Sequence, residues 1–238
     1  MSVGVVRRLL TTREGGYSRA PYDSLNLGEH VGDAPDVVAA NRGVLAQRIG
    51  LPMARLVWME QVHRARVAVV DGPQQAPLMA TDGVVTATPG LALVVLAADC
   101  VPMLLADEGA AVVGAVHAGR VGARSGILAA ALSAMVAAGA HTEAITVLLG
   151  PAVCGRCYEV PADMQAAVVA DLPGSASRTR AGTPGLDIRA GLRRQLREAG
   201  VSEVDQDPRC TVETPELFSH RRGAPTGRFA GAIWVQPR

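Results

Sequence analysis

The chain has 238 residues, of which 49% are hydrophobic, 19% charged and only 3% aromatic, and its formal net charge is +1. This length suits one large domain or two small ones with a self-sufficient core, and the balanced charge argues against a nucleic-acid partner or a membrane surface. Its four cysteines do not resemble a secreted disulfide framework. Because no apolar stretch is long enough for a signal peptide or a membrane span, we expect a cytoplasmic protein.

The first half of the chain predicts one helix and several strands. Residues 1–32 predict a strand followed by long loops. Asp33 is expected to cap a helix that runs to Gly50, because apolar residues recur at helical spacing between them. Short aliphatic runs then predict strands, and several of them lack polar alternation, as strands covered on both faces do. These runs are 56–58, 67–70, 83–85, 91–96 and 111–116.

The second half of the chain predicts a similar mixture of helices and strands. Helices are expected at 122–138 and 162–171, a strand at 145–149 and an exposed loop at 174–185. Asp187 is expected to cap a further helix that ends at Gly200, and residues 227–235 predict a closing strand. Because helices and strands mix without a break in composition, residues 1–238 are interpreted as a single α/β or α+β domain.

Three candidate metal ligands follow or end predicted strands, namely His63, Cys100 and His117. Side chains at strand ends can meet at one rim of a sheet. Two imidazoles and one thiolate suit a tetrahedral Zn²⁺ whose fourth position stays open to water. The wide spacing leaves open that Cys100 is a small buried hydrophobe and that the histidines are hydrogen-bonded core residues. A metal-free Cys100–His117 dyad of a cysteine hydrolase is another alternative.

Three further motifs are candidates for binding or redox chemistry. The glycine-rich segment 117–126 carries Arg120 and Arg124, and is either an anion site or a tight packing turn. The Cys154–Cys157 pair has redox or zinc-knuckle spacing, but without a second such pair we interpret the two thiols as incidental. His220 and the arginines that follow it suit a phosphate or carboxylate, or form a solvated turn.

Several segments together resemble one known family. In chain order they are TTREGGYSRAPYDSLNLGEHVGD (11–33), NR (41–42), WMEQVH (58–63), TDGVVT (81–86), AADCVP (97–102), HAG (117–119), GPAVCGRCYEV (150–160) and FSHRRGAPTGRFAGAIW (218–234). They resemble the YfiH family, called polyphenol oxidase or laccase-domain proteins and later purine nucleoside phosphorylases with adenosine deaminase activity. The resemblance covers nearly the whole chain.

The resemblance implies an α+β fold, a single-domain α-β-β-α layered sandwich with mixed sheets. It implies zinc held by His63, Cys100 and His117, with purine nucleosides and phosphate as small-molecule partners. Family members are similar in phosphorolysis of adenosine, inosine and S-methyl-5'-thioadenosine, and in hydrolytic deamination of adenosine. The low charge and apolar composition also allow a homodimer.

The resemblance and the motifs suggest roles for other residues. Asp99, which precedes Cys100, is interpreted as a catalytic residue that orients a ligand imidazole. The expected substrate-binding residues are Arg42, Arg120, Arg124, His220 and Arg221. The chain departs from the family's pattern at two places: Arg120 and Val121 stand where Trp and Arg are expected, and Gly223 replaces an acidic residue.

Two functions other than a zinc enzyme stay open. A copper-dependent polyphenol oxidase of the ordinary laccase design needs about ten imidazoles, whereas the chain has five. A single copper centre with Met103 as a weak axial ligand is the remaining form of that hypothesis. The other alternative is a peptidoglycan-editing or binding protein with a vestigial metal site, which the altered segment after His117 favours.

Overall fold

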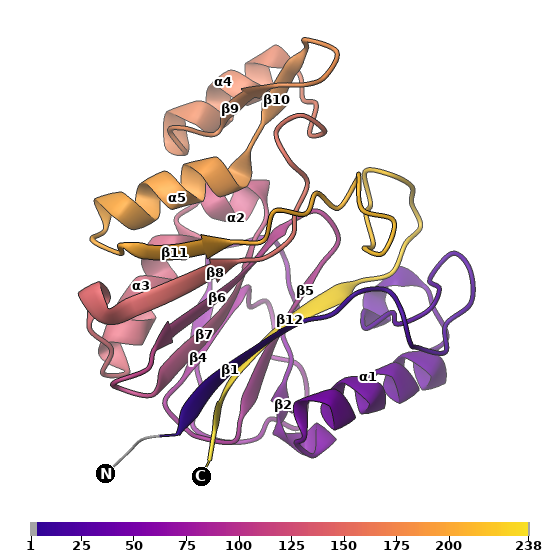
Figure 1. Cartoon of the computed structure of the whole chain (residues 1–238), viewed down its shortest axis with the longest axis vertical. Coiled ribbons are helices and arrows are strands. Elements are labelled where there is room, and N and C mark those ends of the chain that lie inside the picture. Colours follow the sequence, from indigo (N-terminus) through magenta and orange to yellow (C-terminus); the bar gives the residue numbers. More distant parts are fainter. Residues whose placement is uncertain (1–3, 238) are drawn as a thin grey trace.

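Two β-sheets packed face to face organise the computed structural model, which describes residues 4–237 (Figure 1). The strands are β1 (Val5–Leu10), β2 (Leu56–Val57), β3 (Val67–Val69), β4 (Gly83–Thr86), β5 (Ala92–Ala97), β6 (Val101–Asp107), β7 (Val112–Ala118), β8 (Ile145–Leu149), β9 (Ala176–Arg178), β10 (Pro184–Leu186), β11 (Glu203–Gln206) and β12 (Phe229–Gln236). One sheet has the order β1-β12-β5-β2 and the other β11-β8-β6-β7-β4-β3, while β9 and β10 pair separately. Both large sheets combine parallel and antiparallel neighbours.

Helices cover the outer faces of both sheets. The α-helices are α1 (Pro35–Ile49), α2 (Arg120–Arg124), α3 (Ile127–Ala137), α4 (Ala162–Asp171) and α5 (Ile188–Glu198), and 3₁₀ turns lie at Glu29–Val31, Met53–Arg55 and Thr142–Ala144. Figure 1 shows α1 on one side of the paired sheets and α3 and α5 on the other. The chain therefore has the α-β-β-α layering and mixed sheets that its sequence resemblance implied. Within residues 4–237, no helix combines the length and apolarity that crossing a bilayer requires.

Three apolar layers hold the sandwich together, because successive side chains of a strand point to opposite faces. On β5, Leu93 and Val95 pack between the two sheets, whereas Val94 packs toward α1. On β6, Leu104 lies between the sheets and Met103 packs toward α3 and α5. Both faces of these central strands are buried, which is why their sequences lack polar alternation; for β5, the run 91–96, this confirms the expectation.

The structure corrects four expectations about secondary structure. Strands β6 and β11 were not anticipated, and β9 and β10 occupy the predicted exposed loop 174–185. The helix expected from 122 to 138 is two helices, because Gly126 adopts a φ of 88° between α2 and α3. Asp33 is not the cap of α1: Ala34 holds that position and Pro35 follows. The Asp33 carboxylate instead accepts hydrogen bonds from Ser18 and Asn26.

Asp187 does cap α5, as the sequence predicted. Its side chain accepts a hydrogen bond of 3.0 Å from the Ala190 backbone N–H, which satisfies a donor that the first turn of a helix leaves unpaired.

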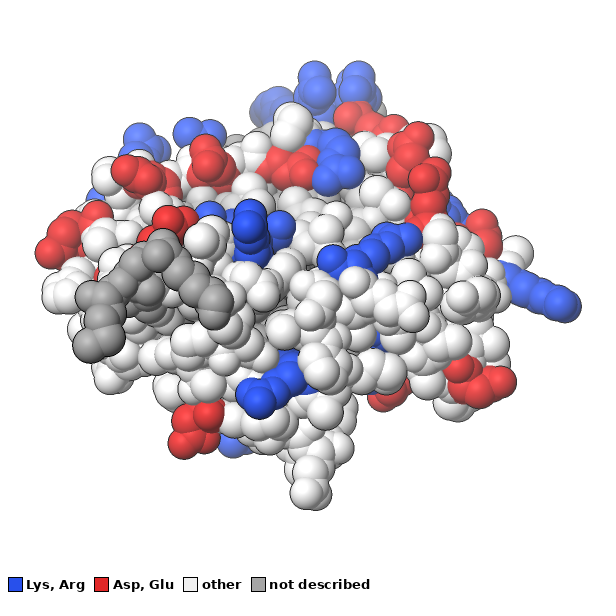
Figure 2. Space-filling model, turned by 60° about the horizontal axis from the view of Figure 1, so that its bottom comes forward, with Lys and Arg blue, Asp and Glu red and all other residues white. Residues whose placement is uncertain are grey.

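On the face shown in Figure 2, acidic and basic side chains are interspersed among mostly uncharged residues. That distribution agrees with the net charge of +1.

The core between the sheets makes a stability prediction. Leu104 is fully buried between the two sheets, so Leu104→Ala is expected to lower the free energy of unfolding by about 2–5 kcal/mol. Urea denaturation monitored by circular dichroism measures this loss. Val69→Ala removes methyl groups from a strand residue that is 57% exposed, and is expected to change stability by less than about 1 kcal/mol. Equal losses in the two variants would contradict this account of the core.

Candidate metal centre and its cavity

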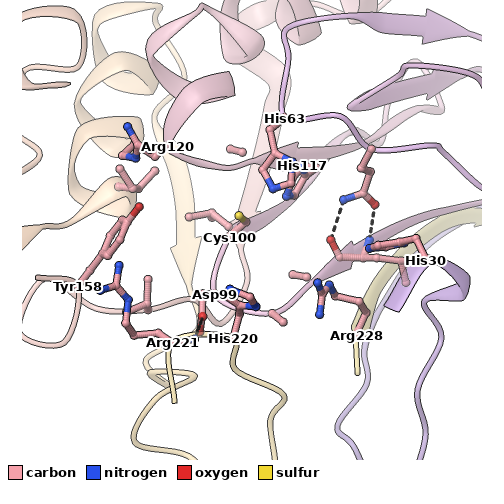
Figure 3. Close-up of a pocket in the computed structure, with 18 residues that line it drawn as sticks. His30, His63, Asp99, Cys100, His117, Arg120, Tyr158, His220, Arg221 and Arg228 are labelled. Carbon is pink, nitrogen blue, oxygen red and sulfur yellow. Dashed lines mark hydrogen bonds between the residues drawn. The ribbon is translucent and has the colours of Figure 1, made fainter. Parts of the chain in front are cut away.

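His63, Cys100 and His117 lie close together in the fold (Figure 3). One ligand atom from each residue lies within 4.8 Å of the others, and the two imidazole rings meet edge to face with their centroids 4.7 Å apart. His117 is the penultimate residue of β7, Cys100 lies in the turn between β5 and β6, and His63 lies in the loop after β2. The structure thus brings together three residues that are far apart in the sequence, with a donor set that suits a tetrahedral zinc.

A buried carboxylate, Asp82, holds the His63 loop in place. Its oxygens accept backbone hydrogen bonds from Val62 at 3.2 Å, His63 at 2.9 Å and Arg64 at 2.8 Å. Three successive N–H groups that converge on one anion form a nest. His63 has a φ of 60°, a conformation that non-glycine residues rarely adopt. The contacts to Asp82 explain how this loop keeps that conformation.

Asp82 also orients the second imidazole. Its Oδ1 lies 2.8 Å from Nδ1 of His117, and its backbone carbonyl accepts a 2.7 Å hydrogen bond from the His117 N–H. This pairing leaves Nε2 of His117 to bind a metal, as a carboxylate partner behind a ligating histidine does. Burial raises the pKa of the Asp82 carboxyl, but hydrogen bonds from the His117 ring and the Arg64 N–H outweigh it, so the pKa falls below its usual value.

The electrostatics of the trio favour a thiolate at Cys100. Burial raises the pKa of this thiol, but the charge of His117 and hydrogen bonds from His117 and His63 outweigh burial and lower the pKa. Burial lowers the pKa of His117, while the Cys100 thiolate and Asp82 raise it overall. The thiolate is the form of cysteine that binds metals, so the residues present fit a bound zinc ion.

Gly119 leaves the space that the trio occupies. A Cβ at this position would lie 3.0 Å from both the Cys100 sulfur and Cδ2 of His63. Gly119→Ala is therefore expected to displace these side chains and weaken zinc binding by about 10-fold or more, as loss of supporting residues around a metal does. Competition with a chromogenic chelator measures the affinity. Gly72→Ala, where an added Cβ meets nothing within 4 Å, is the matched control, and equal affinities in the two variants would refute the expectation.

The trio opens into a cavity of about 340 Å³. This volume lies near the lower end of the roughly 300–1,000 Å³ typical of small-molecule sites. Three of the expected substrate-binding residues line it, namely Arg120, His220 and Arg221. Figure 3 shows Arg120 and Arg221 on one side of Cys100 and Arg228 on the other. A cavity that joins two imidazoles and a thiol to several guanidinium groups suits an anionic or phosphate-bearing reactant.

The other two expected substrate-binding residues do not line the cavity. Arg42 forms a 2.5 Å ion pair with Glu29, and its guanidinium lies 4.0 Å from the centre of the Trp58 ring. Arg124, one turn beyond Arg120 on α2, forms a 2.5 Å ion pair with Asp171. Both guanidinium groups are therefore paired with carboxylates of residues that do not line the cavity.

One of the residues that depart from the family's pattern, Arg120, lies at the cavity, whereas Gly223 is not among the residues that line it. Arg120 lines it, whereas Val121 is 37% exposed and lies outside its wall. The basic group that precedes Val121 thus faces the cavity.

The orienting role expected of Asp99 is wrong. Asp99 lines the cavity, but its Oδ1 accepts hydrogen bonds from the hydroxyls of Thr211 and Ser219, both at 2.6 Å. Its Oδ2 accepts the backbone N–H of Arg221 at 2.6 Å. Asp82 supplies the orienting contact instead. Asp99 holds the segment that carries His220 and Arg221 against the cavity.

Several cavity residues were missed by sequence reasoning. Tyr158 lines the cavity, and the Arg221 guanidinium lies 5.0 Å from the centre of its ring. His30 and Arg228 line the opposite side. Burial, and then the charge of Arg228, lower the pKa of His30, which favours a neutral imidazole. These residues belong to motifs of the family resemblance, but no spacing rule links them to the trio.

A second group of ligand-type side chains surrounds the Cys154–Cys157 pair. Cys210 and Glu213 join these two thiols, and one ligand atom from each of the four residues lies within 4.8 Å of the others. Glu213 accepts hydrogen bonds from Arg180 and from the Cys157 thiol. We interpreted Cys154 and Cys157 as incidental because the sequence shows no second pair of cysteines. Cys210, which lies 56 residues after Cys154, joins them only in the fold.

Comparisons with known proteins agree on one family. Residues 7–236 match the family model described as multi-copper polyphenol oxidoreductase laccase. The chain is 58% identical over 231 residues to a protein named purine nucleoside phosphorylase from Mycobacterium bovis, covering 97% of this chain and 92% of the relative. It is 53% identical over 235 residues to a protein of the same name from Corynebacterium glutamicum, covering 97% and 94%.

Solved structures give the same result for the fold. The chain matches the protein YfiH of Bacillus licheniformis with a TM-score of 0.90 at 30% identity, covering 97% of this chain and 93% of that one. It matches YlmD of Geobacillus stearothermophilus with a TM-score of 0.88 at 34% identity, covering 98% and 92%.

Proposed function

The chain belongs to the laccase-domain family that includes YfiH, and from this premise we propose that it is a zinc-dependent purine nucleoside phosphorylase. Its substrates would be adenosine, inosine and S-methyl-5'-thioadenosine, with deamination of adenosine as a secondary activity. The observation that carries the proposal is a single cavity that joins His63, Cys100 and His117 to Arg120, Arg221 and Arg228. The names of the mycobacterial and corynebacterial relatives support the same reaction.

The arginines account for the acceptor in phosphorolysis. Phosphate is a dianion near neutral pH, and guanidinium groups bind its oxygens with charge-assisted hydrogen bonds. Arg120, Arg221 and Arg228 surround the cavity and would hold phosphate while it attacks C1′ of the sugar as the purine leaves. Binding both reactants in one cavity supplies the orientation that the displacement requires. A bound zinc, held by His63, Cys100 and His117, would act as a Lewis acid.

The acidic residues of the cavity favour phosphorolysis over deamination. Among the residues described, Asp99 is the only carboxylate that lines the cavity, and three hydrogen bonds already engage it. Deamination needs a carboxylate that shuttles a proton to the leaving amine. Because Asp99 is committed to holding the 219–221 segment, we assign it a positioning role and rank deamination second.

A direct assay tests the proposal. Purified protein loaded with zinc is incubated with adenosine and phosphate, and the products are separated by chromatography. Adenine and ribose 1-phosphate are the expected main products, with inosine as a minor one. If metal-replete protein yields neither these products nor hypoxanthine from inosine, the assignment is wrong for these substrates.

The arginines make a second prediction. Arg120→Ala is expected to raise KM for phosphate by about 10-fold or more, because a charge-assisted hydrogen bond contributes roughly 1.5–3 kcal/mol. KM for the nucleoside should change much less. Arg124→Ala removes the same group from α2, where it faces Asp171 outside the cavity, and should leave KM for phosphate unchanged. A larger effect of Arg124→Ala than of Arg120→Ala would reverse this placement of the phosphate.

Copper-dependent oxidation of phenols is the alternative that the family description suggests. The single-copper form of that hypothesis relied on Met103 as an axial ligand. Met103 is fully buried in the core between β6 and the helices, and it is not one of the residues that line the cavity. We therefore favour zinc. A strong visible charge-transfer band in copper-loaded protein, with turnover of phenols, would favour the oxidase instead.

A further inference from the structure

The second cluster of thiols outside the cavity has the geometry of a metal site. Cys154 and Cys157 lie on one turn, and the backbone carbonyl of Cys154 accepts hydrogen bonds from the N–H groups of Cys157 and Tyr158. Cys210 reaches this turn from the segment before β12, and its sulfur accepts the Cys154 N–H at 3.3 Å. This contact joins the two segments that carry the cysteines.

The spacing of the four ligand atoms fits one ion. A tetrahedral zinc with Zn–S bonds of about 2.3 Å places its sulfurs about 3.8 Å apart, and these atoms lie within 4.8 Å of one another. Cys157 Sγ and Glu213 Oε1 are 3.3 Å apart, close to the roughly 3.5 Å expected for sulfur and oxygen on one zinc. An iron–sulfur cluster places several irons between its thiolates and needs a wider group.

From this geometry we propose that Cys154, Cys157, Cys210 and Glu213 form a second metal site that takes a thiophilic divalent cation, with Zn²⁺ the best match. Three thiolates and a carboxylate fill all four positions, so the site is structural rather than catalytic. Cys210 is buried, whereas Cys154 and Cys157 are half-buried and Glu213 borders solvent, which gives an ion a route in. Arg180 binds the Glu213 carboxylate and fixes it beside the thiols.

The position of this site indicates what it stabilises. Val153 and Tyr158, which flank the cysteine turn, line the cavity, and Thr211, next to Cys210, donates a hydrogen bond to Asp99. The ion would therefore join two loops that form one wall of the cavity. Their backbones pair at an isolated β-bridge between Ala152 and Cys210, where the Thr211 N–H donates to the Ala152 carbonyl. A metal brace adds a further link between these loops.

Metal content tests the proposal without relying on activity. The full chain is purified with reductant, loaded with zinc, passed through gel filtration and measured by plasma mass spectrometry. Wild type is expected to hold two equivalents of zinc per chain, whereas Cys210→Ser and Cys100→Ser, the matched substitution in the other cluster, hold one each. Loss of the brace should also lower Tm by roughly 5–10 °C. Cobalt loading adds a signature, because Cys100→Ser keeps the intense bands expected of three thiolates and Cys210→Ser does not.

Two results would overturn the proposal. The first is equal zinc content in wild type and Cys210→Ser. The second is a disulfide within the cluster. It would appear as two free thiols per chain, rather than four, when wild type purified without reductant is denatured and its thiols are counted. If Cys210→Ser does not fold, Glu213→Ala replaces it: this variant keeps all thiols, and it should release one equivalent to a chelator faster than wild type. Equal release rates would contradict the role of Glu213. Loss of turnover in Cys100→Ser leaves this test unaffected, so the two proposals fail separately.

Discussion

Cys100→Ser is expected to abolish zinc binding at the cavity and to lower kcat/KM for phosphorolysis by about 10³-fold. A Lewis-acid metal contributes several kcal/mol of transition-state stabilisation, and each 1.36 kcal/mol corresponds to a factor of about ten in rate. Serine preserves the size of the side chain but supplies no thiolate, so the loss reports coordination rather than packing. Steady-state kinetics and metal analysis of the same sample measure both effects.

The same variant separates an enzyme from a binding protein with a vestigial site. If the chain acts only by binding a partner, Cys100→Ser keeps that function, whereas an enzyme loses turnover. Cys157→Ser, which makes the same change outside the cavity, should retain most of its activity at temperatures below its unfolding transition. Wild-type turnover by metal-free Cys100→Ser would contradict the role given to the trio.

Asp82→Asn is expected to weaken zinc binding at the cavity by about 10–100-fold, the range found when the partner of a ligating histidine is lost. Asparagine is nearly the same size, but its amide cannot accept hydrogen bonds with both terminal atoms. It therefore cannot hold the 62–64 backbone N–H groups and the His117 ring together as the carboxylate does. Chelator competition measures the affinity, and added zinc should restore part of the activity.

Asp99→Asn provides the contrast. Asp99 contacts Thr211, Ser219 and the Arg221 backbone rather than the imidazoles, so zinc affinity should stay near the wild-type value. KM for phosphate should rise, because the segment that carries Arg221 loses an anchor. If Asp99→Asn loses the metal and Asp82→Asn keeps it, the roles of the two carboxylates are exchanged relative to our assignment.

The parts of the fold that the sequence predicted are those with a strong local signal. Spacing predicted helix α1, which ends before Gly50, and the aliphatic strands 91–96 and 111–116. Capping chemistry predicted that Asp187 begins α5. Strand β6 was missed because Pro102 is its second residue, and proline disfavours a central strand. Strand β11 was missed because its sequence, EVDQ, has three polar residues out of four.

The site divides in the same way. His63, Cys100 and His117 are ligand-type residues that follow or end predicted strands, so the sequence alone could nominate them. No spacing rule nominates Asp82. It acts by accepting hydrogen bonds from the His63 loop and from His117 on β7, which come near it only in the fold. Arg120 and Arg124 look equivalent in sequence, and only the position of Asp171 beside Arg124 distinguishes them.

The pairing of β1 with β12 joins residues from opposite ends of the chain, with Val5 opposite Gln236. Strand β12 also pairs with β5, so it lies inside the four-stranded sheet. During synthesis, β1 has no neighbour in that sheet until residues 229–236 leave the ribosome. Such contacts between distant residues slow folding, because the loop must close before they form. The four-stranded sheet is therefore completed only after β12 is made, and Arg228, which directly precedes β12, lines the cavity next to it.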